Sequence, residues 1–180
     1  MNNKNLAAAV NERHRDSIQG ILYISAGLPG AGKSTFLNKN KREEEVIISR
    51  DKIRFSLLKE GEDYFSHEDE VFNIFIQSII KNIKAGKNVY ADATHLSPGS
   101  QMKVLVPILH ETAPAQINYI YFDVPLVICL QRNELRKGTI AYCPPKAIKH
   151  MAEIANFIPC RYIDNAWVVD EETNIYKMKY

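Results

Sequence analysis

The sequence predicts an α/β protein with a mostly parallel central sheet and helices on both of its faces. Short apolar runs typical of buried strands alternate along the chain with segments whose apolar residues recur at a helical spacing. Such alternation within one domain favours a parallel sheet that is covered on both sides. A glycine-rich loop stands directly between the first apolar run and the next helical segment. Because the 180 residues contain no linker, repeat or low-complexity tract, we expect a single domain over residues 1–180.

The first half of the chain is expected to begin with a helical extension and to continue with two strands, each followed by a helix. The extension, residues 1–19, contains the spacing of a short amphipathic helix. ILYISA (21–26) and EVIIS (45–49) are β-prone apolar runs, which predict two buried strands. The helices are expected over STFLNKNK and from about Asp51 to Leu58.

The second half repeats this alternation and is expected to end in a hairpin. Apolar residues from Val71 to Ile83 follow a helical period, and Gly86 is a stop signal just beyond them. NVYADA (88–93) and INYIYF (117–122) predict two further strands. Within residues 161–180, WVVD and IYKMKY are expected to pair as two antiparallel edge strands. Three more helices are expected: from about Pro98 to Glu111, from Pro125 onward, and from about Pro145 to Asn156.

Charge and cysteine content exclude several classes of protein. The 23 basic and 21 acidic residues leave a formal charge of +2, which is too weak for a nucleic-acid coat protein or a membrane-surface binder. Cys129, Cys143 and Cys160 are far apart and odd in number, which favours a reducing, cytoplasmic setting over a disulfide framework. The histidines and cysteines lack metal-site spacing, and no apolar segment has the length of a membrane span. We therefore expect no structural metal and no association with membranes.

GLPGAGKS, residues 27–34, matches the G-x-x-x-x-G-K-S phosphate loop and lies between a predicted strand and a helix start. Its glycines let backbone amides approach phosphate oxygens without a Cβ in the way. Lys33 would bring a positive charge to the β and γ phosphates of ATP, and the Ser34 hydroxyl is placed to ligate Mg²⁺. Thr35 is expected either to touch the α phosphate or only to open the helix. The residues predicted to bind the nucleotide are Gly27, Gly30, Ala31, Gly32, Lys33, Ser34 and Thr35.

SRDKIR, residues 49–54, follows the second predicted strand, and side chains there reach the crevice at the carboxyl ends of the strands. Asp51 and Arg54 are three residues apart, so they share one face of a helix that begins here. Asp51 is the predicted catalytic base, because a carboxylate near the γ phosphate accepts the proton of an attacking hydroxyl. Arg54 would then hold an anionic group of the acceptor. The alternative is that Asp51 only opens a helix and that Arg54 is solvated.

Asp92, at the end of the third predicted strand, is the predicted acid that holds a Mg²⁺-bound water or orients Lys33. Thr94 and His95 follow it in ADATHL and are weaker candidates. A histidine after a strand more often serves the structure than a ligand.

Arg132 and Arg136, in RNELRKG, are four residues apart and would share a helical face. Two arginines placed in this way can close over the transferring phosphoryl group and neutralise charge on its oxygens, which makes both of them catalytic candidates. The alternative is a solvated surface helix.

Taken in order, these motifs resemble the kinase domain of phage-type and bacterial polynucleotide 5′-hydroxyl kinases. The similar segments, between about Ile21 and Met151, are GLPGAGKSTFL, ISRDKIR, ADATHLSP, YFDVP, RNELRKGT and CPPKAIKHM. The resemblance implies a P-loop kinase fold with an arginine-bearing lid, and ATP held by Lys33 and Ser34. It also implies that Asp51 is the general base and that Arg54 contacts the 3′ phosphate of the acceptor. The arginines implied to grip the donor phosphates are Arg132 and Arg136.

The chain also departs from that family. His95 stands where family members often have asparagine, and the residue at the position of Asp92 varies among them. No phosphatase-like D-x-D motif follows the kinase segment. The chain therefore resembles the kinase part alone, and it is expected to act beside a separate phosphatase or ligase.

The preferred hypothesis is transfer of the γ phosphate of ATP to the 5′ hydroxyl of an RNA or DNA end. A small-molecule kinase is the main alternative, because nucleoside-monophosphate kinases and zeta-toxin-like sugar-nucleotide kinases share the loop and the acidic motif. The third hypothesis is a nucleotide-dependent binding switch, which would transfer no phosphate to an acceptor. In such a switch, Asp51 would have no proton to take.

Overall fold

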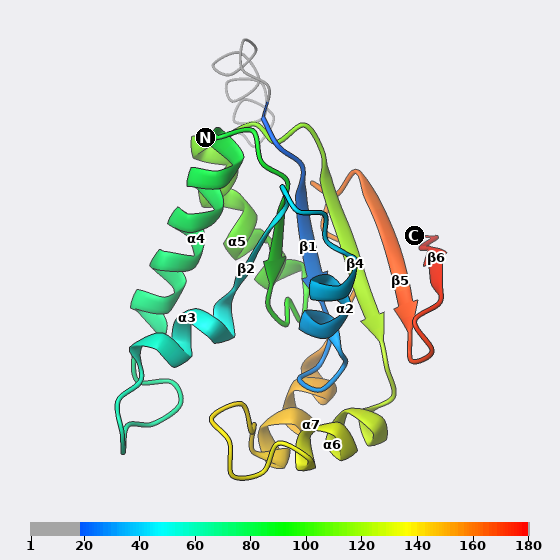
Figure 1. Ribbon diagram of the computed structural model, residues 1–180. Coiled ribbons are helices and arrows are strands. Elements are labelled where there is room, and N and C mark those ends of the chain that lie inside the picture. The colour runs from blue at the N-terminus through cyan, green and yellow to red at the C-terminus, as the bar shows by residue number, and fades with distance from the viewer. Residues whose placement is uncertain (1–18, 180) are drawn as a thin grey trace.

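The computed structural model describes residues 19–179, which form a six-stranded sheet flanked by helices (Figure 1). The strand order is β2-β3-β1-β4-β5-β6, and all neighbouring strands run parallel except β5 and β6. The predicted α/β fold with a mostly parallel sheet is confirmed. The helix expected in the amino-terminal extension falls on residues 1–18, outside the described residues. The strands are β1 (Leu22–Ala26), β2 (Val46–Ser49), β3 (Val89–Asp92), β4 (Ile117–Asp123), β5 (Asn165–Asp170) and β6 (Ile175–Lys177).

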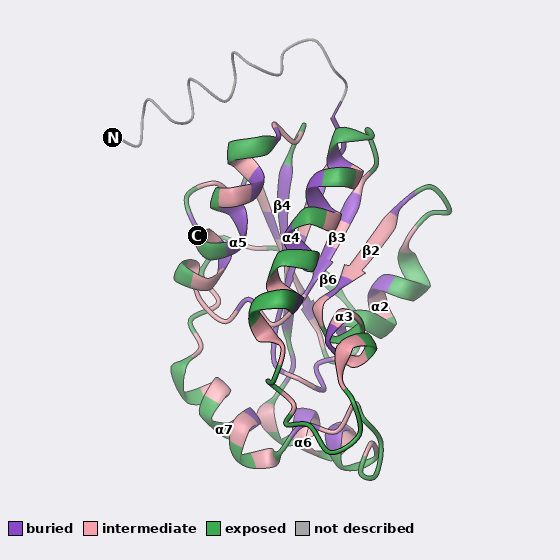
Figure 2. Ribbon diagram, turned by 90° about the vertical axis from the view of Figure 1, so that its left-hand side faces the viewer, coloured by how far each residue is buried: buried purple, intermediate pink, exposed green. Residues whose placement is uncertain are grey.

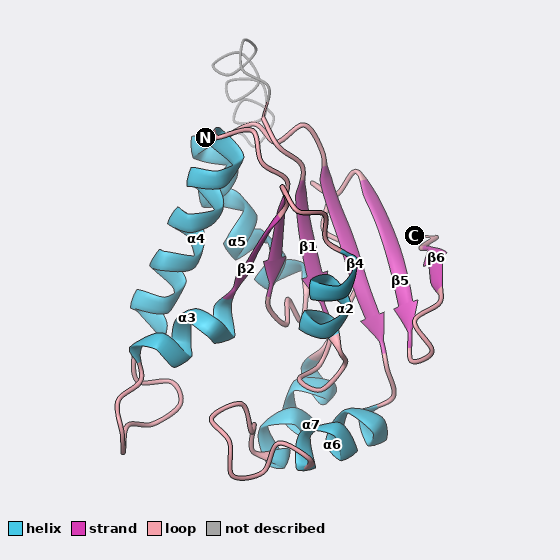
Figure 3. Cartoon of the chain, in the orientation of Figure 1, coloured by secondary structure: helices cyan, strands magenta, loops and turns pink. Residues whose placement is uncertain are grey.

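Helices cover both faces of the sheet and one of its ends. Figures 1 and 2 show α2 on one face, with α4 and α5 toward the other. Figure 3 shows α6 and α7 beyond the carboxyl ends of the strands. No helix among residues 19–179 has the length and hydrophobicity needed to cross a membrane. The helices are α2 (Lys33–Asn40), α3 (Arg50–Leu57), α4 (Glu68–Lys84), α5 (Pro98–Glu111), α6 (Leu126–Glu134) and α7 (Pro145–Ile154).

The main core lies between the sheet and the pair α4 and α5. Val71, Phe75, Ile79 and Ile83 are fully buried at a helical spacing along α4, as the sequence predicts. Burying each such side chain contributes about 1.5 to 3 kcal/mol. The packing therefore fixes α4 on the sheet, and it also fixes the position of Glu68 in the first turn of this helix.

The carboxyl-terminal strands pair antiparallel with each other, as WVVD and IYKMKY predict, but β5 is not an edge strand. It also pairs in parallel with β4, so only β6 lies at the edge. The buried Gln101 side chain of α5 holds the segment that leads into β5. Its Oε1 accepts the Cys160 amide at 2.8 Å, and its Nε2 donates to the Ile158 carbonyl at 3.1 Å.

The carboxyl ends of β1, β2 and β3 meet at one end of the sheet, because these strands are parallel and in register. The phosphate loop follows β1, α3 follows β2, and Asp92 ends β3. Three motifs that are far apart in the sequence therefore converge at this end, which α6 and α7 cover (Figure 3).

Candidate active site

The phosphate loop folds tightly between β1 and α2, and Lys33 is the first residue of the helix. The Lys33 ammonium donates to the carbonyl oxygens of Gly27 and Leu28, both at 2.9 Å. Burial lowers the pKa of Lys33 from its ordinary value, and the carboxylates of Asp92 and Asp51 oppose this shift. The Lys33 ammonium is therefore buried, and it donates hydrogen bonds to two backbone carbonyl oxygens of the phosphate loop itself.

Two glycines of the loop are required by close contacts. A Cβ on Gly30, which has a φ of +87°, would lie 2.3 Å from the Cys129 carbonyl oxygen of α6. A Cβ on Gly27 would lie 3.0 Å from the Phe122 carbonyl oxygen at the end of β4. The loop is thereby held against β4 and α6, which brings α6 next to the phosphate site.

Some loop amides already have partners within the protein. The Gly27 amide donates to the Thr94 carbonyl at 3.0 Å, and the Ala31 amide donates to the Leu28 carbonyl at 3.1 Å. Gly27 lies outside the lining of both cavities described below, whereas Ala31 lines the second. In the described structure, Gly27 thus connects β1 to the loop after β3.

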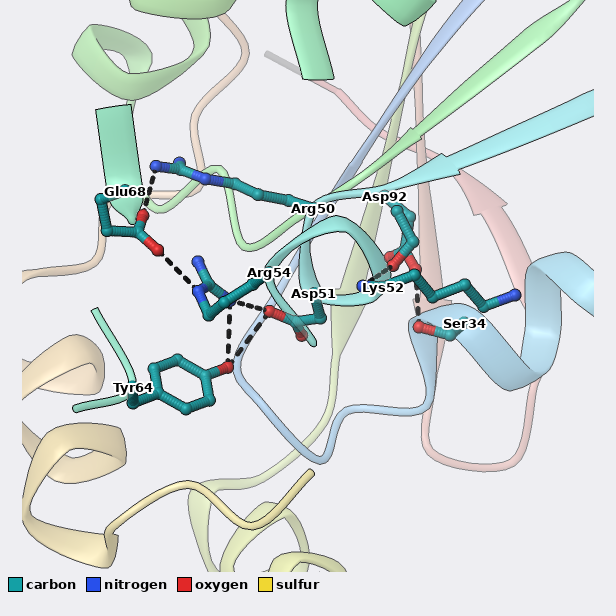
Figure 4. Close-up of polar contacts among 9 residues, drawn as sticks. Ser34, Arg50, Asp51, Lys52, Arg54, Tyr64, Glu68 and Asp92 are labelled. Atoms are coloured by element: carbon teal, nitrogen blue, oxygen red, sulfur yellow. Dashed lines mark hydrogen bonds and ion pairs between the residues drawn. The ribbon is translucent and has the colours of Figure 1, made fainter. Parts of the chain in front are cut away.

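Ser34 and Asp92 form the oxygen-rich part of the site. The Ser34 hydroxyl donates to Asp92 Oδ2 at 2.6 Å (Figure 4). The Ser25 hydroxyl of β1 donates to Asp92 Oδ1 at 3.4 Å. Ser34 and Asp92 both line the cavity over the phosphate loop. Among residues 19–179, no group of three or more His, Cys, Asp or Glu side chains has the arrangement of a metal site.

Asp51 and Arg54 face each other across the first turns of α3. The Ser49 side chain opens this helix by accepting the Lys52 amide at 3.5 Å. Arg54 Nη1 is ion-paired with Asp51 Oδ1, and this pair joins a buried guanidinium, 7% exposed, to a carboxylate that is 63% exposed. The helical face predicted for the two residues is therefore present, but Arg54 is buried rather than solvated.

Glu68 completes the group from the first turn of α4. Its two carboxylate oxygens accept from Arg54 Nε at 2.6 Å and from Arg50 Nη2 at 2.7 Å (Figure 4). Burial alone would raise the pKa of Glu68, but the hydrogen bonds and charges of the two arginines lower it below its ordinary value. This part of the site is thus a network of two arginines and two carboxylates.

Tyr64 reaches the same network from the connection between α3 and α4. Its hydroxyl accepts from Arg54 Nη1 at 3.0 Å and donates to Asp51 Oδ1 at 3.2 Å. The sequence analysis missed Arg50, Tyr64 and Glu68 as members of this site. The sequence did contain a signal for Glu68. This acidic residue lies one turn before the apolar run of α4, and its charge is opposite to that of the nearby arginines Arg50 and Arg54.

Arg132 and Arg136 do not share a helical face, contrary to the prediction. Helix α6 ends at Glu134, and Arg136 lies in the turn that follows, where its amide donates to the Asn133 carbonyl at 2.9 Å. The Asn133 side chain is buried and bonds both the amide and the carbonyl of Cys143, which turns the chain back toward the loop. Both arginines still reach the phosphate-loop region, but from two different elements.

His95 has a structural contact and is neutral at pH 7. Its ring Nδ1 lies 2.5 Å from the Ser25 carbonyl oxygen, and burial lowers its pKa to about 4. Its Nε2 is buried without a hydrogen-bond partner among the described residues. Thr94 lines the cavity over the loop, whereas His95 lies outside that lining.

Two cavities meet at the phosphate loop. The first, of about 180 Å³, runs from Lys33 and Ser34 to Asp51, Arg54 and Tyr64. The second, of about 450 Å³, lies on the other side of the loop, between α2 and the turn that joins β5 to β6. Arg136 and Thr35 line both cavities, whereas Arg132 lines only the second. The predicted site residues are therefore gathered around one continuous region at the end of the sheet.

A comparison with protein families finds a family model that matches most of the chain. Residues 22–156 match the model of the AAA domain family. The chain belongs to this family. A comparison with curated proteins finds no match.

Solved structures share the fold of this AAA domain. A chain of the Pnkp1/Rnl/Hen1 RNA repair complex matches at 23% identity and a TM-score of 0.62, over 84% of this chain and 52% of that one. A sugar kinase from Janibacter sp. HTCC2649 matches at 14% identity and a TM-score of 0.57, over 88% of both chains. The PezAT toxin-antitoxin system of Streptococcus pneumoniae matches at 14% identity and a TM-score of 0.53, over 97% of this chain and 78% of that one.

These likenesses show the fold alone, and the AAA domain spans about half the length of the chain that it matches in the RNA repair complex. With its phosphate loop, the chain is a P-loop kinase-like domain, which implies ATP binding.

Proposed function

We propose that the chain transfers the γ phosphate of ATP to the 5′ hydroxyl of a polynucleotide end. The observation that carries this proposal is that Asp51, with its carboxylate exposed, lines the same cavity as Lys33 and Ser34. Transfer to a hydroxyl requires a proton acceptor that faces the donor phosphates across a shared space. The arginine three residues after this carboxylate, together with the order of the motifs, supports a nucleotide acceptor with a following phosphate.

On the donor side, Lys33 would exchange its contacts to loop carbonyls for the β and γ phosphate oxygens. The helix start at Lys33 adds the amides of α2 to this anion site. Arg136 lines both cavities, so it is the arginine best placed to neutralise charge on the transferring group. Arg132 would contact the donor from the side of the second cavity.

Ser34 and Asp92 fit a magnesium site, because hydroxyl and carboxylate oxygens are the ligands that Mg²⁺ prefers beside substrate phosphates. The hydrogen bond of 2.6 Å between these two side chains already brings both oxygens to one point. When bound, Mg²⁺ supplies positive charge to the donor phosphates.

On the acceptor side, Asp51 would take the proton of the attacking hydroxyl. The hydroxyl oxygen forms a bond to the γ phosphorus, the bond from that phosphorus to the β–γ bridging oxygen breaks, and ADP leaves with the electron pair. Arg54 would bind the phosphate that follows the first nucleoside of the acceptor.

Separate enzymes would supply the other steps of an end-processing reaction. In the RNA repair complex that shares this fold, Pnkp1 is assembled with Rnl and Hen1. For the present chain, we propose a phosphatase or a ligase as a separate partner in the cytoplasm.

A small-molecule kinase is the second candidate, and the charge of the connection between α3 and α4 favours it. Residues 59–70, which cover most of this connection and the first turn of α4, contain a single lysine, Lys59, and six acidic side chains: Glu60, Glu62, Asp63, Glu68, Asp69 and Glu70. This segment carries Tyr64 and Phe65, which line the acceptor cavity. Its negative charge would repel the further phosphates of a long polynucleotide but not a compact acceptor.

The deciding experiment is transfer of labelled γ phosphate from ATP to a matched panel of acceptors. The panel contains 5′-hydroxyl RNA and DNA oligonucleotides, a nucleoside 3′-monophosphate, the bare nucleoside, a nucleoside 5′-monophosphate, a sugar and a sugar nucleotide. We expect product from the oligonucleotides and the 3′-monophosphate, and much less from the bare nucleoside. Strong activity on the 5′-monophosphate, the sugar or the sugar nucleotide alone would instead support the second candidate.

A further inference from the structure

Tyr64 is a side chain in the acceptor cavity to which the mechanism above gives no role. It comes from the connection between α3 and α4, thirteen residues after Asp51 in the chain. We infer that Tyr64 is a positioning residue that, together with Arg54, selects Oδ2 as the oxygen of Asp51 that takes the proton. The inference rests on the proposed function, because it requires Asp51 to be the base.

Within residues 19–179, the hydrogen bonds to the Asp51 carboxylate all fall on one oxygen. Oδ1 accepts both the Arg54 Nη1 donor and the Tyr64 hydroxyl, at 3.2 Å from the latter (Figure 4). Among the described residues, Oδ2 has no hydrogen-bond partner. A carboxylate oxygen offers about two lone pairs to donors in its plane, so both positions on Oδ1 are used. The incoming proton therefore has a free acceptor only at Oδ2.

The hydroxyl of Tyr64 remains a donor at neutral pH. Burial and the negative charge of Asp51 raise the pKa of Tyr64 above its ordinary value. Arg54 stays charged as well: burial alone would lower its pKa, but the hydrogen bond to Glu68 and the nearby carboxylates raise it. Lys33 and Cys143 are the other titratable groups that face Asp51, from the phosphate loop and from the segment after α6.

The ring of Tyr64 is held in place independently of its hydroxyl. The Arg54 guanidinium lies 4.6 Å from the ring centroid, and the rings of Phe55 and Phe65 meet its edge or face at centroid distances of 6.1 and 4.8 Å. These contacts remain when the hydroxyl is removed. Tyr64→Phe is therefore a substitution that tests the hydrogen bond with little disturbance of the packing.

Tyr90→Phe is the matched control. The Tyr90 hydroxyl of β3 donates to Glu45 Oε2 at 3.1 Å, so this variant also loses a bond from tyrosine to carboxylate. Neither Tyr90 nor Glu45 lines the cavity that contains Asp51. A general loss of stability would thus affect both variants, whereas an effect on the proton acceptor would affect only Tyr64→Phe.

The first test measures transfer kinetics with an acceptor that gives product in the panel above. We expect Tyr64→Phe to lower kcat about 3- to 10-fold, which corresponds to one hydrogen bond, and to leave KM for ATP unchanged. An equal loss of kcat in Tyr90→Phe, or an unchanged kcat in Tyr64→Phe, would overturn the inference.

The second test separates the inference from the proposed function. In an Asp51→Asn background, Tyr64→Phe should have no further effect on kcat, because the two residues act through one carboxylate. If Asp51→Asn alone keeps the full rate, the proposed function fails. If Asp51→Asn loses the rate and Tyr64→Phe still lowers it independently, only the inference fails.

Discussion

Removal of the negative charge of Glu68 should destabilise the protein measurably. Glu68→Gln replaces a carboxylate, whose two oxygens accept from Arg54 and Arg50 at 2.6 and 2.7 Å, by an amide whose single oxygen can accept from only one of the two arginines. A charge-assisted hydrogen bond contributes about 1.5 to 3 kcal/mol and a neutral one about 0.5 to 1.5. One bond is weakened and the other is lost, and the Glu68 side chain is 26% exposed, so we expect a loss of about 2 kcal/mol in the free energy of unfolding. In a domain of this size, that loss lowers Tm by about 4 to 8 °C.

The pH dependence of this loss has a defined sign. The pKa of Glu68 is lowered from its ordinary value of 4.5, so the folded state binds its proton less tightly than the unfolded state does. The stabilisation by Glu68 is therefore complete above pH 4.5, and it is lost as the pH falls through the lowered pKa. The difference in Tm between the wild type and Glu68→Gln should be constant near neutral pH and should narrow in acid.

Thermal unfolding followed by circular dichroism measures this difference, and Glu111→Gln provides the control. Glu111 pairs with Lys84 at 3.1 Å, but both side chains are about half exposed, so the loss there should stay within the small range of surface ion pairs. If Glu68→Gln is no less stable than Glu111→Gln at neutral pH, the arginine–carboxylate network does not stabilise the fold.

Four further outcomes are expected. Lys33→Ala should abolish phosphoryl transfer and leave the circular dichroism spectrum intact, and a near-normal rate would contradict the assignment of the phosphate loop. Asp51→Asn should keep ATP affinity but lose about 10²- to 10⁴-fold in kcat, whereas an equal loss of ATP binding would make Asp51 a nucleotide or metal ligand instead. Arg54→Ala should narrow the preference for acceptors with a 3′ phosphate, measured as the ratio of kcat/KM values. Gly30→Ala should lower Tm, because a Cβ there would lie 2.3 Å from the Cys129 carbonyl oxygen.

The local elements of this fold could be predicted from the sequence because their signals are local. The apolar period of α4 and the β-prone run of β1 depend on residues close together in the chain. The partner of β5 could not be predicted in this way. It depends on contacts between residues far apart in the chain, such as the hydrogen bonds of Gln101 in α5 to the backbone of Ile158 and Cys160 before β5.

The site was predicted as a set of motifs but not as a network. The phosphate loop, Asp51 and Asp92 follow three strands of a parallel sheet, so their convergence follows from the topology alone. The position of Arg136 does not follow from the topology. It depends on where α6 ends, and helix ends are the elements that a sequence predicts least precisely. The same limit applies to Tyr64, whose contact with Asp51 depends on the path of an irregular connection.

Under the proposed function, Arg54 would both bind an acceptor phosphate and hold the base, and its geometry allows it to do both. Its Nε donates to Glu68 and its Nη1 donates to Asp51 and Tyr64. Nη2 has no hydrogen-bond partner among the described residues, and Arg54 lines the acceptor cavity. A guanidinium presents five donors in a fixed fork, so one edge can hold the protein network while the remaining nitrogen binds the acceptor phosphate. A lysine, as a single flexible ammonium, could not keep the three protein contacts and bind a phosphate in the same geometry. If the proposed function is correct, position 54 therefore requires arginine. Asp51 and Glu68 would then orient the Arg54 guanidinium and would not compete with the acceptor phosphate for its free nitrogen.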